Sequence, residues 1–248
     1  MKMITTIAQR EMNALFSTPM GWFALFSFVL LSGLVFSILI TNAIEISLFG
    51  PALDVHQVIL PNFFGILILF LLFLSPAVGM GIFSQDLQQK RFSWLLGTPI
   101  SSWELVLGKW LGLSGFMSIL ILSSTHCMGL LSWFADPKWE FIVLNYMTLW
   151  LCSQGFISIA MLCSAQSANS LISLASSFAI LFILWFMGPL GDPFGNAFSQ
   201  FIYYASPLPR VEHLLDGWVM FYDVIYFVLL TMLSIFWTVH RIERYRWQ

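Results

Sequence analysis

The sequence predicts an all-α polytopic membrane protein with six transmembrane helices. Of its 248 residues, 59% are hydrophobic and 9% are charged, and the mean hydropathy is +0.86. About a quarter of the residues in ordinary soluble domains are charged, so this composition is typical of a membrane protein. Apolar runs of about twenty residues recur along the chain, and that length crosses a hydrocarbon core of about 30 Å. The polar segments between the runs are short, so we expect residues 1–248 to form a single transmembrane domain.

The first nineteen residues are expected to lie in the membrane interface. Within them, residues 3–17 fit an amphipathic helix, because their apolar side chains fall largely on one side. These side chains are Ile4, Ile7, Ala8, Met12, Leu15 and Phe16. A helix with this pattern lies along the membrane surface instead of crossing it. Pro19 is expected to end the helix, which also carries the adjacent charges of Arg10 and Glu11.

Six spans follow from the apolar runs. We expect them at about residues 22–43, 59–83, 105–133, 141–163, 171–189 and 224–239. Pro76 lies inside the second span and should kink it, because proline lacks the backbone N–H of an interior helical residue. Gly108, Gly112 and Gly115 lie early in the third span, where small residues permit close contact with another helix.

The segment at residues 84–104 is a polar, mixed-charge break between the second and third spans. A short amphipathic helix over Asp86–Leu96 fits its spacing, with Gly97 and Pro99 as stop signals. Ser102 is expected to cap the next helix, whose first turn carries Glu104. The polar residues and the apolar ridge of Trp94, Leu95 and Leu96 leave two interpretations open: contact with lipid headgroups, or docking on a soluble partner.

Residues 190–222 differ from the rest of the chain. They are rich in glycine and proline at first, and then alternate aromatic and polar residues. The segment is too polar to cross the bilayer by itself. We therefore expect an interfacial or re-entrant segment, with Asp223 just outside the last span.

Basic residues predict the orientation of the chain. With both termini inside, eight of the ten basic residues lie on the cytoplasmic side and two lie outside, as the positive-inside rule requires. The inner residues are Lys2, Arg10, Lys90, Arg91, Lys109, Arg241, Arg244 and Arg246, and the outer ones are Lys138 and Arg210. An even number of spans also puts both termini on one face. Lys2, Lys109 and the C-terminal arginines are interpreted as anchors to anionic headgroups.

Catalytic motifs are absent from the sequence. It contains no GxxxxGK[ST] phosphate loop, HExxH or GxSxG pattern, and no charged residue in the middle of an expected span. Its three cysteines, Cys127, Cys152 and Cys163, lie in apolar runs without metal-ligand spacing. We therefore expect neither an enzyme nor a metal site. The net charge of −2 does not favour a nucleic-acid partner.

A few polar residues lie inside the spans. His126 could shuttle a proton or bind a metal ion, but no carboxylate lies near it in sequence. We therefore favour a hydrogen bond between helices for His126, and likewise for Gln154. Asn145 lies near the end of its span. These scattered residues do not form the polar cluster that an intramembrane enzyme, such as a lipid-modifying transferase, would need.

Three blocks of the sequence resemble those of one family. The first is Arg10-Glu11 followed by Phe16-Ser17-Thr18-Pro19-Met20-Gly21-Trp22. The second, residues 94–109, reads Trp-Leu-Leu-Gly-Thr-Pro-Ile-Ser-Ser-Trp-Glu-Leu-Val-Leu-Gly-Lys. The third comprises Ser206-Pro207, Gly217, Asp-Val-Ile-Tyr-Phe at 223–227 and Arg-Tyr-Arg-Trp at 244–247. In combination they resemble the membrane subunit of ABC-2-type ABC transporters, in particular the gliding-motility-associated permease branch. Lys90-Arg91 depart from the pattern, because that family usually has Gly-Thr there.

The resemblance implies a division of labour between subunits. A separate ABC ATPase, present in two copies, would bind ATP and Mg, and this chain would bind no cofactor itself. Residues 84–104 would be the cytoplasmic coupling helix that docks on the ATPase, through Asp86, Lys90, Arg91, Trp94, Leu95, Leu96, Thr98, Pro99 and Glu104. Arg10 and Glu11 would belong to the interfacial helix, and Pro207, Glu212 and Gly217 to an extracytoplasmic gate.

The same resemblance implies an assembly in the bacterial inner membrane, with both termini cytoplasmic. A second permease, either the same chain or a related subunit, would pair with this one so that substrate leaves between them. Membrane lipids and an extracytoplasmic auxiliary protein would be further partners. The alternative is a non-transporting anchor or mechanical subunit of a motility or secretion complex, which would share this architecture. The sequence does not identify a substrate.

Overall fold

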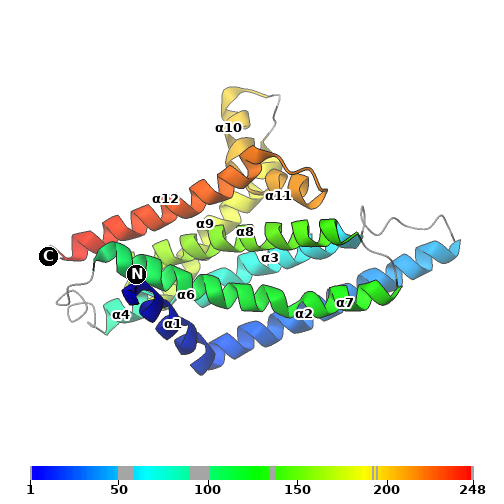
Figure 1. The fold of residues 1–248 in the computed structure, drawn as a ribbon. Coiled ribbons are helices and arrows are strands. Elements are labelled where there is room, and N and C mark those ends of the chain that lie inside the picture. Colours follow the sequence, from blue (N-terminus) through cyan, green and yellow to red (C-terminus); the bar gives the residue numbers. More distant parts are fainter. Residues whose placement is uncertain are drawn as a thin grey trace.

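The polypeptide folds into a bundle of long helices (Figure 1). The computed structural model describes residues 2–49, 59–89, 101–134, 138–191, 193 and 195–246, and every regular element in those ranges is helical. The helices are α1 (Lys2–Ser17), α2 (Pro19–Phe49), α3 (Leu60–Gly79), α4 (Ser84–Gln88), α6 (Ser102–Ser123), α7 (Thr125–Phe134), α8 (Trp139–Ser164), α9 (Ser170–Phe186), the 3-10 helix η2 (Gly188–Leu190), α10 (Ala197–Ala205), α11 (Leu208–Leu215) and α12 (Phe221–Arg246).

Five helical stretches of the described chain are long and apolar enough to cross a membrane. They are Pro19–Ile46, Leu60–Gln88, Ser102–Trp133, Trp139–Ser164 and Phe221–Tyr245. The chain is therefore an all-α polytopic membrane protein, as the composition predicted. The expected span at 171–189 corresponds to α9, which has 17 residues. At 1.5 Å per residue α9 is about 25 Å long, slightly short of the hydrocarbon core, so a sixth span stays a prediction.

Contacts at its two ends connect α9 to α4 and to the segment before α11. Ser170 Oγ, at its start, lies 2.9 Å from Ser84 Oγ of α4. The carbonyl oxygen of Trp185, near its end, accepts a hydrogen bond of 3.3 Å from Ser206 Oγ, two residues before α11. Both chain ends lie at the α4 end of the bundle (Figure 1).

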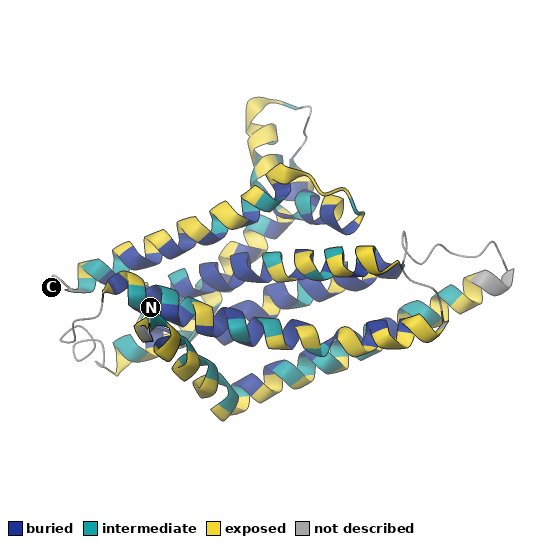
Figure 2. Cartoon of the chain, in the orientation of Figure 1, coloured by how far each residue is buried: buried dark blue, intermediate teal, exposed yellow. Residues whose placement is uncertain are grey.

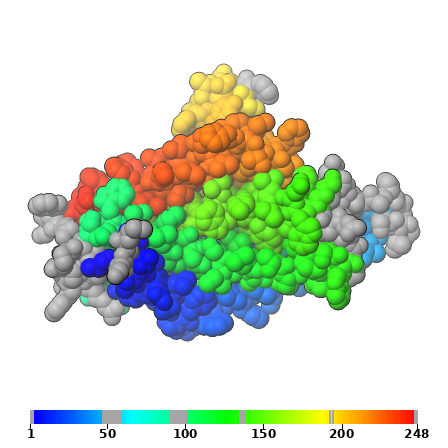
Figure 3. All heavy atoms as spheres, viewed as in Figure 1, coloured from blue at the N-terminus to red at the C-terminus, as the bar shows by residue number. Residues whose placement is uncertain are grey.

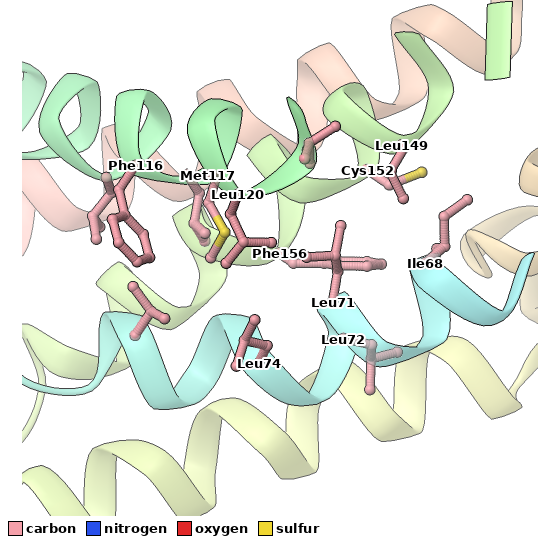
Figure 4. Packing of buried hydrophobic residues seen from close by; sticks show 14 of the residues in the cluster. Ile68, Leu71, Leu72, Leu74, Phe116, Met117, Leu120, Leu149, Cys152 and Phe156 are labelled. Carbon is pink, nitrogen blue, oxygen red and sulfur yellow. The ribbon is translucent and has the colours of Figure 1, made fainter. Parts of the chain in front are cut away.

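The bundle core lies where α3, α6 and α8 meet. Of the five apolar stretches, the one formed by α8 is the most buried, and the one in α2 is the least, with exposed side chains along its outer face (Figure 2). Leu71, Phe116 and Phe156 come from the three central helices and are almost completely buried (Figure 4). Gly79 lets α3 approach α8, since a Cβ there would lie 2.7 Å from Ala160 Cβ.

Helix α1 packs along the first half of α6 (Figure 3). The three early glycines of α6 form the contact surface: a Cβ at Gly108 would lie 2.8 Å from Ile7 Cβ, and one at Gly112 would lie 2.8 Å from the Ala8 carbonyl oxygen. A Cβ at Gly115 would lie 3.2 Å from Met12 Sδ. The prediction that these glycines permit a close helix contact is confirmed, and the partner is the N-terminal helix. That helix ends at Ser17, as the position of Pro19 predicted, and after Thr18 the same proline begins α2.

The third span, Ser102–Trp133, agrees with the predicted 105–133, but its helix is interrupted. It breaks at Ser124, between α6 and α7. Three consecutive hydroxyls at the break donate hydrogen bonds to carbonyl oxygens three residues earlier: Ser123 at 2.6 Å, Ser124 at 2.8 Å and Thr125 at 2.7 Å. Side chains that bond to the preceding turn in this way bend helices, which is a physical reason for the break.

The last helix is longer than predicted at both ends. Helix α12 begins at Phe221 and ends at Arg246, so Asp223 lies inside its first turn and not outside the span. The preceding segment forms η2, α10 and α11. Helix α11 packs on α3 and α8, whereas α10 projects from the bundle and buries none of its side chains (Figures 1 and 3).

Candidate functional site

The predicted docking segment, residues 84–104, is described only at its two ends. Lys90, Arg91, Trp94, Leu95, Leu96, Thr98 and Pro99 lie outside the described residues. At the N-terminal end, α4 begins at Ser84, two residues before the predicted start at Asp86. At the C-terminal end, the chain enters α6 at Ser102.

Ser102 was predicted to cap α6, and this was wrong. The cap residue is Ser101. The Ser101 backbone N–H donates to the Glu104 carboxylate at 3.3 Å, and the two residues form a capping box. Ser102 is instead the first helical residue and is buried. Glu104, predicted to contact an ATPase, therefore also satisfies a backbone donor that the helix leaves unpaired.

The turn before α4 is attached to the end of α8 by one serine. Ser164 Oγ accepts hydrogen bonds from the backbone N–H groups of Phe83 and Ser84, both at 3.0 Å, and donates to the Met80 carbonyl oxygen at 2.8 Å. These three backbone groups belong to the turn between α3 and α4, where the helical hydrogen-bond ladder is interrupted. The end of α8 therefore fixes the orientation in which α4 leaves the bundle.

A buried ion cluster joins α4 to α6 and α1. Lys109 of α6 is 1% exposed, and its Nζ lies 2.7 Å from Asp86 Oδ2 and 3.4 Å from Glu11 Oε1. The same ammonium donates to the Ile82 carbonyl oxygen at 2.6 Å and lies 4.9 Å from the centre of the Phe83 ring. We call Lys109, Asp86 and Glu11 the Lys109 cluster. It brings together residues that lie up to 98 positions apart in sequence, from 11 to 109.

The surroundings of Lys109 explain why a charge can be buried there. A buried ammonium is costly unless it is paired and hydrogen-bonded, and Lys109 has one carbonyl and two carboxylate partners. Glu11 also pairs with Arg10 at 2.8 Å, so the four side chains together carry no net charge. The interpretation of Lys109 as a headgroup anchor was wrong, because its ammonium does not reach the surface. The sequence feature that could have indicated burial of Lys109 is its position one turn inside an apolar run.

A cavity of about 640 Å³ lies beside the Lys109 cluster. Its walls come from α1, the start of α2, the end of α3, α4 and α6, and include Arg10, Gln85 and all three members of the cluster. Arg10, whose side chain is 58% exposed, carries the accessible positive charge at this place. Among the described residues that line it, no nucleophile is paired with a base. Its arrangement holds three helices together and leaves a space between them.

A second group of charged side chains lies near the start of α12. Asp223 is completely buried; its Oδ1 is 3.9 Å from Arg210 Nε and its Oδ2 is 3.9 Å from His213 Nδ1. Neither carboxylate oxygen has a hydrogen-bond partner among the described residues. We call Asp223, Arg210 and His213 the Asp223 cluster. Sequence reasoning missed it because the three residues were assigned to a polar segment outside the membrane.

Arg210 has further partners that hold it in place. It donates from Nη1 to the Ser206 carbonyl oxygen at 2.9 Å, and its guanidinium carbon lies 4.1 Å from the centre of the Tyr226 ring. Tyr226 in turn donates to the Ala205 carbonyl oxygen at 2.6 Å. These contacts connect the end of α10 and the start of α11 to α12.

The three residues predicted as an extracytoplasmic gate lie close to this cluster in sequence but differ in surroundings. Pro207 is buried and directly precedes α11. Glu212 is exposed on α11 and lines a cavity of about 480 Å³. Gly217 has a φ of +88°, a conformation that favours glycine, and a Cβ there would lie 2.6 Å from the Phe141 ring. Gly217 is therefore required by the turn between α11 and α12.

The remaining polar candidates have local contacts. His126 Nδ1 lies 2.7 Å from the Ser123 carbonyl oxygen and its Nε2 lies 3.3 Å from Cys127 Sγ, so the expected bond to another helix was wrong. Asn145 donates to the Phe141 carbonyl oxygen, one turn earlier in α8. Gln154 donates to Ser153 Oγ at 3.2 Å. Within the described residues, no three His, Cys, Asp or Glu side chains are placed to hold a metal ion.

No protein-family model matches the chain, and no curated protein matches its sequence.

Proposed function

We propose that this chain is the membrane permease subunit of an ATP-driven ABC-2-type exporter. In this proposal a separate ATPase subunit, in two copies, binds ATP and Mg and docks on residues 84–104. Movement of that segment is passed to the transmembrane helices, and substrate crosses the inner membrane between this chain and a second permease. Both termini lie in the cytoplasm. The chain binds no nucleotide itself, in keeping with the absence of a phosphate-binding motif from its sequence.

The Lys109 cluster is the observation that supports this proposal best. A docking segment transmits force only if its ends are attached to the elements that must move. Asp86 belongs to one end of the segment, Lys109 lies in the helix that begins at the other end, and Glu11 lies on α1. A push on residues 84–104 would therefore reach α6 and α1 together, while Ser164 would carry it to α8.

The sequence blocks support the same reading. The described ends of residues 84–104, which are α4 and the start of α6, lie at the end of the bundle where both chain ends also lie. In the proposal Asp86, Lys90, Arg91 and Glu104 add polar contacts to the ATPase. Asp86 and Glu104 would do so in addition to their contacts within this chain.

The proposal is tested by co-purification. The chain is expressed with the ATPase encoded nearest to it, isolated through a tag on this chain, and assayed for bound ATPase and ATP hydrolysis. We expect Trp94→Ala with Leu95→Ala to remove at least nine tenths of the bound ATPase, because burial of such side chains dominates protein interfaces. The matched control is Trp133→Ala with Leu130→Ala, at exposed positions of α7. Full retention of the ATPase by the first variant would contradict the proposed role of residues 84–104.

A second function is favoured by helix α10. Phe198 and Phe201 are 75% and 67% exposed, on a helix that projects from the bundle and is strongly amphipathic. Such a surface fits an extracytoplasmic protein partner and therefore a mechanical subunit of a motility or secretion complex. Stimulation of ATP hydrolysis separates the two functions: an exporter responds to its transported substrate, and a mechanical subunit responds only to the protein partner.

A further inference from the structure

A groove on the side of the bundle lies apart from both charged clusters. It has a volume of about 500 Å³ and is formed by α6, α8 and α12, within the range of about 300 to 1,000 Å³ that is usual for small-molecule sites. Three tryptophans, Trp103, Trp110 and Trp150, contribute to its walls. Met232 and Phe236 line it from α12 and are more than half exposed, so the groove opens toward the lipid-facing side of the bundle.

Two side chains of this apolar groove carry a buried polar atom without a partner. Trp110 Nε1 and Gln154 Oε1 are buried and make no hydrogen bond to the described residues. Gln154 as a whole is only 3% exposed. Two further polar side chains in the lining do have partners: Trp150 Nε1 donates to Ser118 Oγ at 3.0 Å, and Thr231 Oγ1 donates within its own helix. Trp110 Nε1 and Gln154 Oε1 differ from them in having no partner among the described residues.

The neighbouring serine determines which atom of the Gln154 amide is free. Ser153 Oγ donates its hydrogen to the Trp150 carbonyl oxygen at 2.6 Å, so toward Gln154 it can only accept. The amide nitrogen of Gln154 must then point to Ser153, at 3.2 Å, and the amide oxygen is left without a donor. One unpaired acceptor and one unpaired donor consequently belong to the same site.

The two atoms also lie at comparable depth. Trp110 is about 12 Å along α6 from the start of that helix, and Gln154 is about 15 Å along α8 from its end. Those two helix ends lie on the same side of the bundle, because Ser164 at the end of α8 binds the turn that leads into α4, and Asp86 of α4 pairs with Lys109 near the start of α6. At this depth in a membrane-spanning bundle no bulk water is present to satisfy them.

We propose that the groove binds a lipid-soluble alcohol, a molecule with a long apolar body and one hydroxyl group. A hydroxyl donates one hydrogen bond and accepts others, so a single group can satisfy Gln154 Oε1 and Trp110 Nε1 together. An ether can satisfy only the donor of Trp110, and an alkane can satisfy neither. Both atoms lie beneath the groove surface, so binding includes a rotation of these two side chains toward the hydroxyl. This inference goes beyond the proposed function and does not depend on it.

The test is photolabelling of the purified full chain in phospholipid bilayers. The probe is hexadecanol with a diazirine in its alkyl chain, compared with its methyl ether and with the corresponding alkane. We expect the alcohol to label the groove faces of α6 and α12, to be displaced by unlabelled hexadecanol, and to bind about tenfold more tightly than the ether. Gln154→Leu and Trp110→Phe should each weaken labelling by the alcohol about tenfold while leaving labelling by the alkane unchanged.

Trp150→Phe is the matched control, because the indole N–H of Trp150 already has a partner. It should change labelling by the alcohol no more than about twofold, since only wall area is altered. Equal labelling by alcohol, ether and alkane on the unmodified chain would show that the groove holds ordinary acyl chains and would overturn the proposal, even if a variant failed to fold. Labelling that falls as the density of protein in the bilayer rises would show that a second copy of this chain covers the groove. That result would also overturn the proposal.

Discussion

The Lys109 cluster and the Asp223 cluster are both buried but are built differently. At the Lys109 cluster, every hydrogen bond and ion pair of the ammonium is 3.4 Å or shorter and is made to an oxygen. At the Asp223 cluster, both ion pairs are 3.9 Å long and neither carboxylate oxygen makes a hydrogen bond to the described residues. A buried charge with close partners rigidifies its surroundings, whereas a poorly satisfied one is costly to keep. The α1–α4–α6 junction is therefore the more rigid of the two. At the α11–α12 junction, moving the helices apart costs less free energy.

The largest effect is expected from removing the central charge of the satisfied cluster. Lys109→Met leaves Asp86 and Glu11 facing each other with little exposure, and breaking a buried ion pair in this way costs about 3 to 5 kcal/mol. The unfolding free energy of the detergent-solubilised chain is the measurement. Adding Asp86→Asn and Glu11→Gln should recover most of the loss, because no unpaired buried charge then remains and Arg10, which loses Glu11, is exposed. Unchanged stability of Lys109→Met would show that the cluster does not hold the junction.

A smaller effect is expected when the helices are separated without changing a charge. In Gly112→Ala the new Cβ would lie 2.8 Å from the Ala8 carbonyl oxygen and 2.9 Å from Glu11 Cβ, so α1 must move away from α6. Overpacking of this kind costs about 1 to 3 kcal/mol. We expect a lower unfolding free energy and faster proteolysis of α1. Gly129→Ala has open space around its Cβ among the described residues and should be neutral or stabilising by up to about 1 kcal/mol.

The smallest effect is expected at the loosely paired cluster. Asp223→Asn removes a buried charge that makes no hydrogen bond to the described residues, so the attraction lost at 3.9 Å is largely offset by the desolvation cost that disappears. The unfolding free energy should fall by about 1 kcal/mol or less. If Asp223→Asn lowered the unfolding free energy as much as Lys109→Met does in the same detergent, the two clusters would contribute equally to stability, and this prediction would be wrong.

Hydropathy predicted five spans that the structure also has, because crossing a bilayer requires an apolar run of about twenty consecutive residues. Helix α8, for example, begins at Trp139 and ends at Ser164, against a predicted span of 141–163. The break at Ser124 was missed because a window of hydropathy does not register hydroxyls that bond to the preceding turn. Asp223 was placed outside the last span for a related reason: a charge was taken to end the helix, although α12 begins at Phe221.

The candidate site was predicted only in part. Residues 84–104 were singled out from their charge and apolar ridge, but most of the predicted contact residues, from Lys90 to Pro99, lie outside the described residues. Asp86 and Glu11 were both named beforehand, yet no local pattern indicated that Lys109 lies between them. Such a contact depends on how three helices pack, and hydrophobic periodicity on any single helix contains no information about it.

By itself, the sequence determined that this chain is a helical membrane protein, roughly where its long helices lie, and which polar segment separates the second apolar run from the third. Each of these properties depends on residues close together in the chain. Only the tertiary structure decided that α1 packs on the glycine face of α6, that Lys109 is buried between Asp86 and Glu11, and that Asp223 is buried with no hydrogen bond to the described part of the chain. The physical reason is that the cost of burying a charge depends on its neighbours in space, and those are set by helix packing.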